Sequence, residues 1–377
     1  MVMVAQESGC SDAIRLCLAG DVMTGRGIDQ ILAHPSAPWL RESCVASALT
    51  YVELAAGAQG PIPRPVADTY IWGDVLHELA QRPDLRVINL ETSITTSDAY
   101  LPKGINYRMH PANIGCLTAA GIDCCALANN HVLDWGTPGL CETLTTLGAA
   151  GIASAGAGRN AVEAARPALL EVAGKGRVLV FSVGVEDSGI PPDWAAGSGH
   201  PGVNWIARIA ERQVADIAAQ VRAVKCPGDV AVVSIHWGGN WRYEIPREQR
   251  IFARALIDTA AVDVVHGHSS HHPKGFEIHR GKLILYGCGD LLNDYEGIRG
   301  HEQYCGDLSL LYFLDVDPHG GELRCLGMTP LRIRGFRLCR AAPADAEWLR
   351  ATLDRESRRF GAGVELGPDG RLVAHWR

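Results

Sequence analysis

Short, uniformly apolar runs recur along the chain, and each one ends in polar or glycine-rich residues. The runs are AIRLCLAGD, LRVINLET, DCCALANNH, RVLVFSVG, DVAVVSIHWG, VDVVHGH and KLILYGCGD. Runs this short, without an alternating polar face, are typical of strands buried on both sides, as in parallel sheets. We therefore predict an α/β protein in which helices between the strands cover the sheets.

Helical patterns lie between several of these runs. The segment TPGLCETLTTLGAAG begins with Thr-Pro, a favourable cap and first-turn pair, and ends at glycine. Two further segments, RIAERQVADIAAQVRAV and PREQRIFARALIDTAAV, have amphipathic spacing. Residues 34–70 and 186–205 lack such patterns, and we interpret both as long loops. Loops of this length are either lids and binding loops or plain surface insertions.

The sequence changes character after about residue 335. ADAEWLRATLDRESRRF has the pattern of an amphipathic helix, and VELGPDGRLVAHW is typical of a hairpin with a Gly-Pro-Asp-Gly turn. We therefore expect a main domain over residues 12–335 and a small C-terminal appendage, made of a helix and a hairpin, over residues 336–377.

Charge and composition argue against some partners and locations. The 377-residue chain has a formal net charge of −7 and a sequence pI near 6.1, so it offers no basic field for nucleic acid. No apolar run is long enough to span a membrane, and the start MVMVAQESGCSDAIR lacks the pattern of a secretory signal. We therefore expect a cytoplasmic protein without a membrane segment.

The 12 cysteines are scattered through the sequence, and no two of them form a C-x-x-C pair. A zinc-thiolate site is therefore poorly supported. We expect most of the cysteines to be small buried hydrophobic residues.

Potential metal ligands follow five of the apolar runs. The stretch DVVHGHSSHHPKG carries four histidines, and four other runs end in LAGD, INLE, LANNH and VSIHWG. Open α/β sheets bind ligands beyond the carboxyl ends of their strands. Carboxylate, amide oxygen and imidazole together favour a first-row divalent metal over thiolate-rich chemistry. The residues concerned are Asp21, Glu91, Asn130, His131, His236, His266, His268, His271 and His272.

A site with two metals needs a bridging carboxylate, terminal imidazoles, and a water or hydroxide as nucleophile. Asp21 and Glu91 can supply the carboxylates, and Asn130 can supply a carbonyl oxygen. His131 could then stand off the metal and donate a proton to the leaving group. The imidazole ligands would come from His236, His268 and His271.

The order of these motifs, GD, NLE, NNH, HWG and GHxxH, resembles the CapA or poly-gamma-glutamate capsule-biosynthesis family of the calcineurin-like metallophosphoesterase superfamily. The resemblance covers roughly residues 14–334, in LAGDVMTGRG, VINLETSIT, ALANNHVLDWG, VSIHWGGNW and VVHGHSSHHPKGFEIHRGKLILYGCGD. It implies a four-layer α/β/β/α sandwich of two mixed sheets. It also implies His131 as the catalytic histidine, Glu91 as the bridging carboxylate, and further metal ligands at Asp21, Asn130, His236, His268 and His271.

Two positions depart from the superfamily pattern. A metallophosphoesterase usually has Asp-x-His on its first strand, but here Met23 stands where the histidine is expected, and Glu91 stands where an aspartate is usual. One terminal ligand is thus missing, and His266 or Asp290 could replace it. We therefore expect one or two divalent transition metals, either Mn, Fe or Zn.

Some histidines near the ligands have plainer interpretations. We place His266 on the strand face opposite His268 and interpret it as structural. Asp290, in YGCGD, suits a turn after a strand. For the last ligand we favour His271 over His272.

Candidate substrate-binding residues lie near the ligands in sequence. The stretch LPKGINYRMHP offers Lys103, Tyr107 and Arg108 for a carboxylate or phosphate, and Arg26 follows the first ligand closely. A solvated loop with incidental basic residues explains the same stretch equally well. Trp135, Trp237 and Trp241 could line the site, or they could simply be part of the hydrophobic core.

These residues favour a metal-dependent hydrolase, in which a metal-bound hydroxide attacks a phosphoester or a gamma-glutamyl-like amide of an anionic substrate. The resemblance to CapA supports a second function, a non-hydrolytic accessory protein in poly-gamma-glutamate synthesis or export. A third function is a small-molecule biosynthetic enzyme that acts on an amide bond. Neighbouring capsule ligase and transporter genes would favour the second function, and a small-molecule gene cluster the third.

Overall fold

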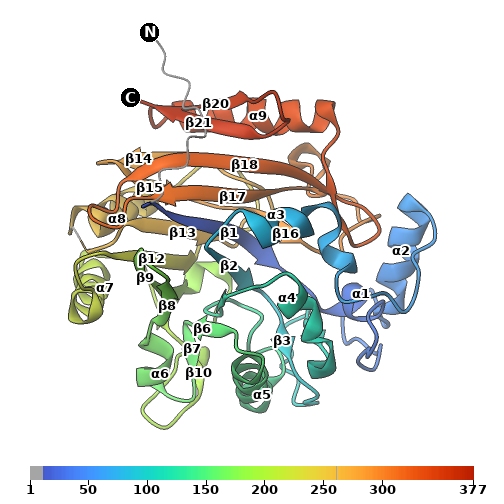
Figure 1. The fold of residues 1–377 in the computed structure, drawn as a ribbon. Coiled ribbons are helices and arrows are strands. Elements are labelled where there is room, and N and C mark those ends of the chain that lie inside the picture. Colours follow the sequence, from blue (N-terminus) through green and yellow to red (C-terminus); the bar gives the residue numbers. More distant parts are fainter. Residues whose placement is uncertain (1–11, 260) are drawn as a thin grey trace.

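Two large mixed sheets form the body of the molecule (Figure 1). The computed structural model describes residues 12–259 and 261–377. Strand β1 of the larger sheet is parallel to β2 and antiparallel to β17, so the sheet is mixed. The larger sheet contains, in spatial order, β20 (Ala362–Leu366), β21 (Leu372–Trp376), β18 (Leu323–Ile333), β17 (Leu308–Val316), β1 (Ile14–Val22), β2 (Leu85–Leu90), β5 (Cys124–Ala126) and β6 (Ala153–Ala155), with β16 (Asp290–Leu292) paired to β1 and β19 (Leu338–Arg340) paired to β18.

The second large sheet contributes a run of parallel strands whose carboxyl ends lie together. β12 is parallel to both β9 and β13, and β13 is parallel to β15, whereas β14 and β15 are antiparallel. Its strands are β11 (Trp205–Ile206), β9 (Gly176–Val185), β12 (Asp229–His236), β13 (Val264–His268), β15 (Lys282–Leu285) and β14 (Phe276–His279), with β8 (Ala168–Val172) paired to β9. Two small sheets pair β3 (Ser93–Ile94) with β4 (Arg108–Met109), and β7 (Ala157–Gly158) with β10 (Gly202–Val203).

Helices lie between and around the strands, which confirms the predicted α/β class. None of the helices within the described residues is long and apolar enough to cross a membrane. The α-helices are α1 (Arg26–Asp29), α2 (Leu49–Gln59), α3 (Leu76–Gln81), α4 (Gly115–Ala119), α5 (Gly136–Ala149), α6 (Ala161–Ala165), α7 (Glu211–Val224), α8 (Arg247–Asp258) and α9 (Pro343–Arg358). Short 3-10 helices are η1 (Tyr70–Val75), η2 (Pro111–Asn113), η3 (Glu186–Ser188), η4 (Pro192–Trp194) and η5 (Glu302–Tyr304).

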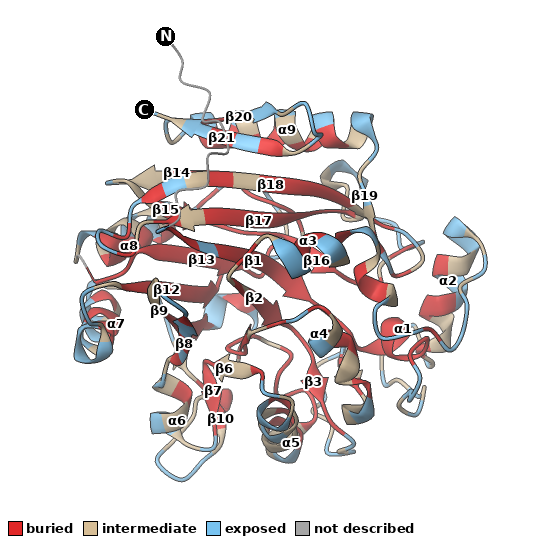
Figure 2. Ribbon diagram, viewed as in Figure 1, coloured by how far each residue is buried: buried red, intermediate tan, exposed pale blue. Residues whose placement is uncertain are grey.

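Apolar side chains cover both faces of the two large sheets, which explains why the strands are so uniformly apolar. Leu16 of β1 and Val232 of β12 belong to one core cluster, so this cluster joins the two sheets. Cys17, the next residue of β1, packs instead with side chains of α1 to α5. Val233, the next residue of β12, packs with α7 and α8. In Figure 2 the central strands are accordingly almost entirely buried.

Three predicted helices are confirmed as α5, α7 and α8, but the loop predicted over residues 34–70 is wrong in part. This stretch contains α2, and its last residue, Tyr70, is the first residue of η1. The segment LTYVELAAGAQ contains three alanines and only one charged residue, so it shows no polar face that would mark a surface helix. It buries Tyr51, Val52 and Ala55. Residues 186–205 are largely irregular, as predicted, with two short 3-10 helices and the two-residue strand β10.

The cysteines are less buried than expected. Four of those that the structure describes are only half-buried, and Cys44 and Cys226 are exposed. The buried ones are Cys17, Cys116, Cys124, Cys125 and Cys288. Burial in strands therefore explains fewer than half of them.

The C-terminal segment forms the predicted helix and hairpin, and both pack on the rest of the chain. Strand β21 of the hairpin pairs with β18, with Leu372 opposite Met328. Leu349 and Leu353 of α9 are buried in the core cluster that joins the two sheets. The division into domains at residue 335 stays a prediction.

If α9 is part of the main core, Leu353→Ala should lower the free energy of unfolding by about 2–5 kcal/mol, because it leaves a cavity among buried side chains. Denaturant unfolding followed by circular dichroism measures this. Leu366→Ala is the matched control, because Leu366 is 40% exposed and should change stability by about 0.5 kcal/mol or less. Equal small effects in both variants would contradict this packing.

Candidate metal centre

Three predicted ligands meet at the carboxyl ends of β1, β12 and β13. His236 ends β12 and His268 ends β13, and the two residues are paired in register. Their Nδ1 atoms are 2.8 Å apart, and Nδ1 of His268 lies 3.8 Å from Oδ1 of Asp21 on β1. One ligand atom from each of the three residues lies within 4.8 Å of the others. These residues can therefore share one cation.

A second group of ligand atoms shares Asp21 with the first. Its other members are His271 and Asp290, and the three ligand atoms again lie within 4.8 Å of one another. Asp290 begins β16, which pairs with β1 so that Asp290 stands beside Asp21. The turn predicted for Asp290 is therefore wrong, because this residue forms part of a strand next to the first ligand.

Glu91 and Asn130 lie against the first group. Oε1 of Glu91 is 3.8 Å from Nε2 of His236 and 3.8 Å from Nε2 of His131. Oδ1 of Asn130 is 3.1 Å from Nε2 of His236. The other carboxyl oxygen of Glu91 is buried and has no hydrogen-bond partner. All six predicted ligands are thus brought to one place.

The carboxyl groups of this centre are crowded and deprived of water. Burial, followed by the charge of Asp290, raises the pKa of Asp21 to about 7. Burial, followed by the charges of Asp21 and Asp290, raises the pKa of Glu91 well above its usual range. Burial lowers the pKa of His236 and of His268, so both imidazoles stay neutral. Neutral imidazoles beside crowded carboxyl groups are the donors that a divalent cation satisfies, so these residues fit a metal.

Hydrogen bonds hold Asp21 in position. Nδ2 of Asn89 donates to Oδ1 of Asp21 at 2.7 Å, and the backbone amide of Ser269 donates to Oδ2 at 3.1 Å. Ser269 follows His268 directly and has a left-handed backbone, with φ of +92°. A serine seldom adopts this conformation, and such strain is found preferentially at functional sites.

His131 stands beside the ligands and is held by Asp134. Nδ1 of His131 lies 2.7 Å from Oδ2 of Asp134, which directs Nε2 toward Glu91. Asp134 is fully buried and accepts hydrogen bonds from the amide of Tyr107 at 2.6 Å and from Nζ of Lys103 at 2.8 Å. Burial lowers the pKa of His131 to about 4, so its imidazole is neutral near pH 7. Asp134 was not among the predicted site residues, although NNHVLD places it three residues after the histidine.

His266 lies on the same strand face as His268, so the predicted opposite orientation is wrong. Side chains two residues apart on a strand point to the same side. Oγ of Ser234 lies 3.1 Å from Nδ1 of His266 and 2.8 Å from Nε2 of His268. Nε2 of His266 pairs with the carbonyl oxygen of Ala19 at 2.9 Å. Both ring nitrogens of His266 are therefore engaged by the protein, as a structural role requires.

Of the four predicted substrate-binding residues, Lys103 has a charged group beside His131. Its Nζ is 3.3 Å from Nδ1 of His131 and also donates to the carbonyl oxygen of Asn130. Because Nζ forms an ion pair with Asp134, its charge acts on the pair formed by His131 and Asp134.

The other three predicted substrate-binding residues contact the protein itself. The guanidinium of Arg26 is buried and forms a 2.5 Å ion pair with Asp294. The hydroxyl of Tyr107 lies 2.9 Å from that of Tyr295. Arg108 lies 3.9 Å from the ring centre of Trp135. In the structure these side chains stabilise loops around the centre.

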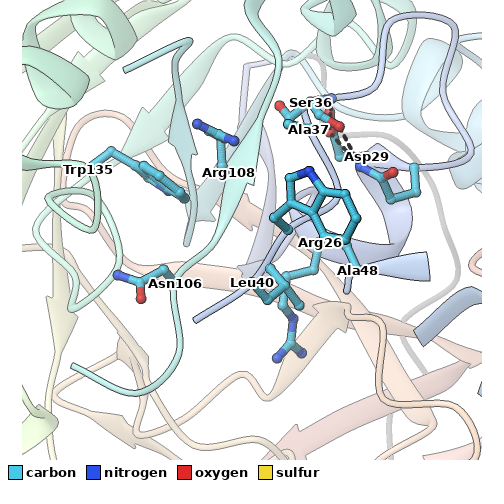
Figure 3. Close-up of a pocket in the computed structure, with 11 residues that line it drawn as sticks. Arg26, Asp29, Ser36, Ala37, Leu40, Ala48, Asn106, Arg108 and Trp135 are labelled. Atoms are coloured by element: carbon cyan, nitrogen blue, oxygen red, sulfur yellow. Dashed lines mark hydrogen bonds between the residues drawn. The ribbon is translucent and has the colours of Figure 1, made fainter. Parts of the chain in front are cut away.

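Two cavities lie near these residues and differ greatly in size. The smaller, of about 10 Å³, is lined by Arg26, Arg108 and neighbouring side chains and has room for about one water (Figure 3). The larger, of about 690 Å³, is lined by His271, Asn240 and Tyr295 among others. The larger cavity therefore reaches a member of the second ligand group and is wide enough for a substrate.

One of the three tryptophans lines the larger cavity, whereas the other two and His272 are buried. Trp241 lines the larger cavity and stacks on His301 with ring centres 3.9 Å apart. Trp237 and Trp135 are buried and donate to backbone carbonyl oxygens at 3.0 Å. His272 stacks on a tyrosine ring, with ring centres 4.5 Å apart, and belongs to neither ligand group.

The motifs that form this centre also relate the chain to known proteins. The family model of the bacterial capsule synthesis protein PGA_cap matches residues 15–295, which include all of the ligands described above. The chain belongs to this family. The resemblance inferred from the order of the motifs is thereby confirmed.

Relatives of this PGA_cap chain include proteins that are named for polymer or capsule synthesis. The probable polyglutamine synthesis accessory protein of Mycobacterium tuberculosis (strain ATCC 25618 / H37Rv) is 50% identical over 368 residues, which cover 97% of each chain. The PGA biosynthesis protein CapA of Bacillus subtilis (strain 168) is 25% identical over 286 residues, which cover 75% of this chain and 64% of the relative. The capsule biosynthesis protein CapA of Bacillus anthracis is 25% identical over 192 residues, which cover 51% of this chain and 45% of the relative.

The metal-free PGA_cap chain should lose stability in acid partly through His266. Burial lowers the pKa of His266 to about 4, whereas the pKa of a histidine in the unfolded chain is about 6.5. Only the unfolded chain binds this proton between these values, so stability present above about pH 6.5 is lost as the pH falls. His266 should account for about 2 kcal/mol of the loss between about pH 7 and pH 5.

Urea unfolding of the chelated protein at both pH values tests this. The loss should be smaller in His266→Gln and unchanged in His319→Gln, because His319 is exposed. An equal loss in the wild type and in His266→Gln would show that His266 does not contribute.

Proposed function

We propose that this chain is an accessory protein in the synthesis of a polyglutamate-type polymer and that it acts there as a metal-dependent hydrolase. The names of its relatives support the biological role. The observation that carries the chemistry is the convergence of Asp21, His236 and His268 beside the pair formed by His131 and Asp134.

The metal would be held by residues of the first group, with Glu91 and Asn130 beside them. These ligands suit Mn, Fe or Zn. When bound, a divalent cation supplies polarisation of a scissile carbonyl or phosphoryl group and activation of water. Asn89 and the amide of Ser269 keep Asp21 oriented for this task.

His131 would move the proton. Its Nδ1–H donates to Asp134, so the lone pair of Nε2 faces the centre beside Glu91. Nε2 can take a proton from the attacking water and then deliver it to the leaving group of a phosphoester or amide. The ion pair with Lys103 and the amide of Tyr107 hold Asp134 in place. Asp134 is thus a positioning residue for His131.

We also propose the finer fold assignment, the four-layer α/β/β/α sandwich of metallophosphoesterases. It is supported by the three core clusters, one joining the sheets and one on each outer helical side. In such an architecture the active site lies at the carboxyl ends of the strands, as the ligand groups do here.

A second candidate function is non-hydrolytic, and the word "accessory" in the name of the mycobacterial relative supports it. In that role the protein would bind an anionic polymer without cleaving it. The larger cavity, next to His271, would then serve as the binding site.

Elemental analysis should find at least one divalent transition metal per chain after mild purification. Glu91→Ala and Asp21→Ala should lose most of it, because each removes a carboxylate of the centre. His319→Ala, far from the ligands in sequence and exposed, should retain the wild-type content. No bound metal, even after reconstitution with Mn, Fe and Zn, would rule out the hydrolase.

Replacing Asp134 by asparagine should slow hydrolysis by about 10²–10⁴-fold and leave the metal content unchanged. The reason is that asparagine cannot stabilise the Nδ1–H tautomer and the protonated ring of His131 as a carboxylate does. Rates are measured over a range of pH with p-nitrophenyl phosphate, bis-p-nitrophenyl phosphate and gamma-glutamyl p-nitroanilide, and Asp134→Glu should restore part of the rate.

Wild-type rates in Asp134→Asn would show that Asp134 does not position His131. If the metal-loaded wild type cleaves none of these compounds but binds poly-gamma-glutamate, the non-hydrolytic function is the correct one.

A further inference from the structure

We propose that this protein holds a gamma-linked polyglutamate chain in an extended site, which runs from the larger cavity across Arg299 to helix α2. The proposal rests on the polymer role of the proposed function and adds a binding site outside the metal centre. Its basis is a pair of cavities on either side of one exposed segment, residues 297–302. Arg299 binds a carboxylate of the polymer there.

The two cavities have this segment as a common wall. One is the larger cavity, of about 690 Å³, and the other, of about 580 Å³, is lined by residues of α2 and is called the α2 cavity below. Both are lined by Gly297, Ile298, Arg299 and Glu302. Cavities that hold small ligands usually measure about 300–1,000 Å³, so each of these can hold part of a longer chain. A ligand that fills both cavities must pass over the segment.

The segment lies directly against α2. Gly297 has a left-handed backbone, with φ of +83°, and a Cβ atom there would lie only 2.7 Å from the carbonyl oxygen of Leu54. Glycine at this position therefore lets the segment approach the helix closely. Ile298 and Leu54, both large apolar side chains, are 50% and 38% exposed. They offer an apolar surface to the methylene groups of a ligand.

Arg299 differs from the other two arginines that line the larger cavity. Arg26 is paired with Asp294 at 2.5 Å. Arg332 is paired with Asp345 at 2.8 Å. Arg299 is exposed, and its guanidinium forms neither an ion pair nor a hydrogen bond within residues 12–259 and 261–377. It is therefore the arginine of this cavity that remains available for charge-assisted hydrogen bonds to an anionic ligand.

Acidic side chains in the same walls restrict which anions fit. Glu302 lines both cavities, and Glu53 lines the α2 cavity. Hydrogen bonds from its own backbone amide and from that of Gly300 lower the pKa of Glu302, so this carboxylate stays ionised. The other acids of the larger cavity accept hydrogen bonds from the protein. Such walls disfavour the closely spaced phosphates of a nucleic acid and suit a polymer whose charges are separated by neutral groups.

A gamma-linked polyglutamate chain has groups that match these walls. Each of its units carries a carboxylate, two methylene groups and a backbone amide. The carboxylate fits Arg299, and the methylene groups fit Ile298 and Leu54. The amide N–H can donate a hydrogen bond to an acid such as Glu302. A chain with amidated side groups lacks the carboxylates and leaves Arg299 without an anion.

Fluorescence anisotropy of an end-labelled, gamma-linked glutamate decamer with the full-length, metal-loaded protein tests the role of Arg299. The initial anisotropy measures binding, and a later fall reports cleavage. Arg299→Glu should weaken binding at least about tenfold, because a repulsive charge replaces an attractive one. Arg212→Glu makes the same change in net charge on α7, on the opposite side of the molecule from α2 (Figure 1), and should bind like the wild type. An unlabelled decamer with amidated side groups should compete at least about tenfold less well than the acid form.

A second variant tests the α2 cavity separately. Gly57 lies in α2 and lines the α2 cavity but not the larger one, and a Cβ atom added there meets nothing within 4 Å. Gly57→Tyr should therefore obstruct the α2 cavity and weaken binding of the decamer at least about threefold. Gly57→Ala, the matched control, leaves the cavity open and should bind like the wild type. Both variants should keep the wild-type metal content, because neither touches the ligands.

The outcomes separate this site from the proposed function. Wild-type affinity in both Arg299→Glu and Gly57→Tyr overturns the extended site and leaves the proposed function standing. A loss in Arg299→Glu alone supports the carboxylate contact and overturns the extension over α2. Equal competition by the acid and amidated decamers overturns the recognition of carboxylates. If the metal-loaded wild type binds no decamer, this site and the polymer role both fail, and the metal content still tests the hydrolase.

Discussion

The burial of three carboxyl groups, Asp21, Glu91 and Asp290, in one place is the interaction on which the rest of this centre depends. Removing like charges from water is strongly unfavourable unless protons or cations accompany them. The facing sheet places His236 and His268 beside these carboxyl groups, and their neutral rings, at the ends of two adjacent parallel strands, could hold such a cation. The sheets are thus joined by apolar packing along their length and by ligand chemistry at one end.

Much of this arrangement could be predicted from the sequence because it depends on local patterns. Uniform apolar runs identified the strands, and the polar residues at the ends of five of these runs marked candidate ligands such as Asp21 and His236. The features that escaped prediction depend on contacts between distant segments. The place of Asp290 in a strand beside Asp21 depends on the pairing of β16 with β1. This pairing requires glycine at Gly20, because a Cβ atom there would lie only 1.8 Å from the carbonyl oxygen of Gly289.

The residues predicted to bind substrate show the opposite limit of sequence-based prediction. Long basic side chains near a ligand in sequence can be engaged by partners that the sequence does not reveal. Arg26 is held by Asp294, which lies 268 positions away along the chain. The error at His266 had a simpler source, since its spacing from His268 already requires a shared strand face. Asp134 was detectable in principle, because the turn after NNH brings it back to His131.

The ligands stand on strand ends, whereas much of the wall of the larger cavity comes from the segment between β16 and β17, with side chains such as Ile298, Arg299 and His301. Loops of this kind tolerate replacement far better than buried strands do. The wall of this cavity can therefore change during evolution while the candidate metal ligands keep their places. Among proteins that share these motifs, similarity at the strand ends therefore bears on the proposed metal centre, whereas similarity in the loops bears on what the larger cavity can bind.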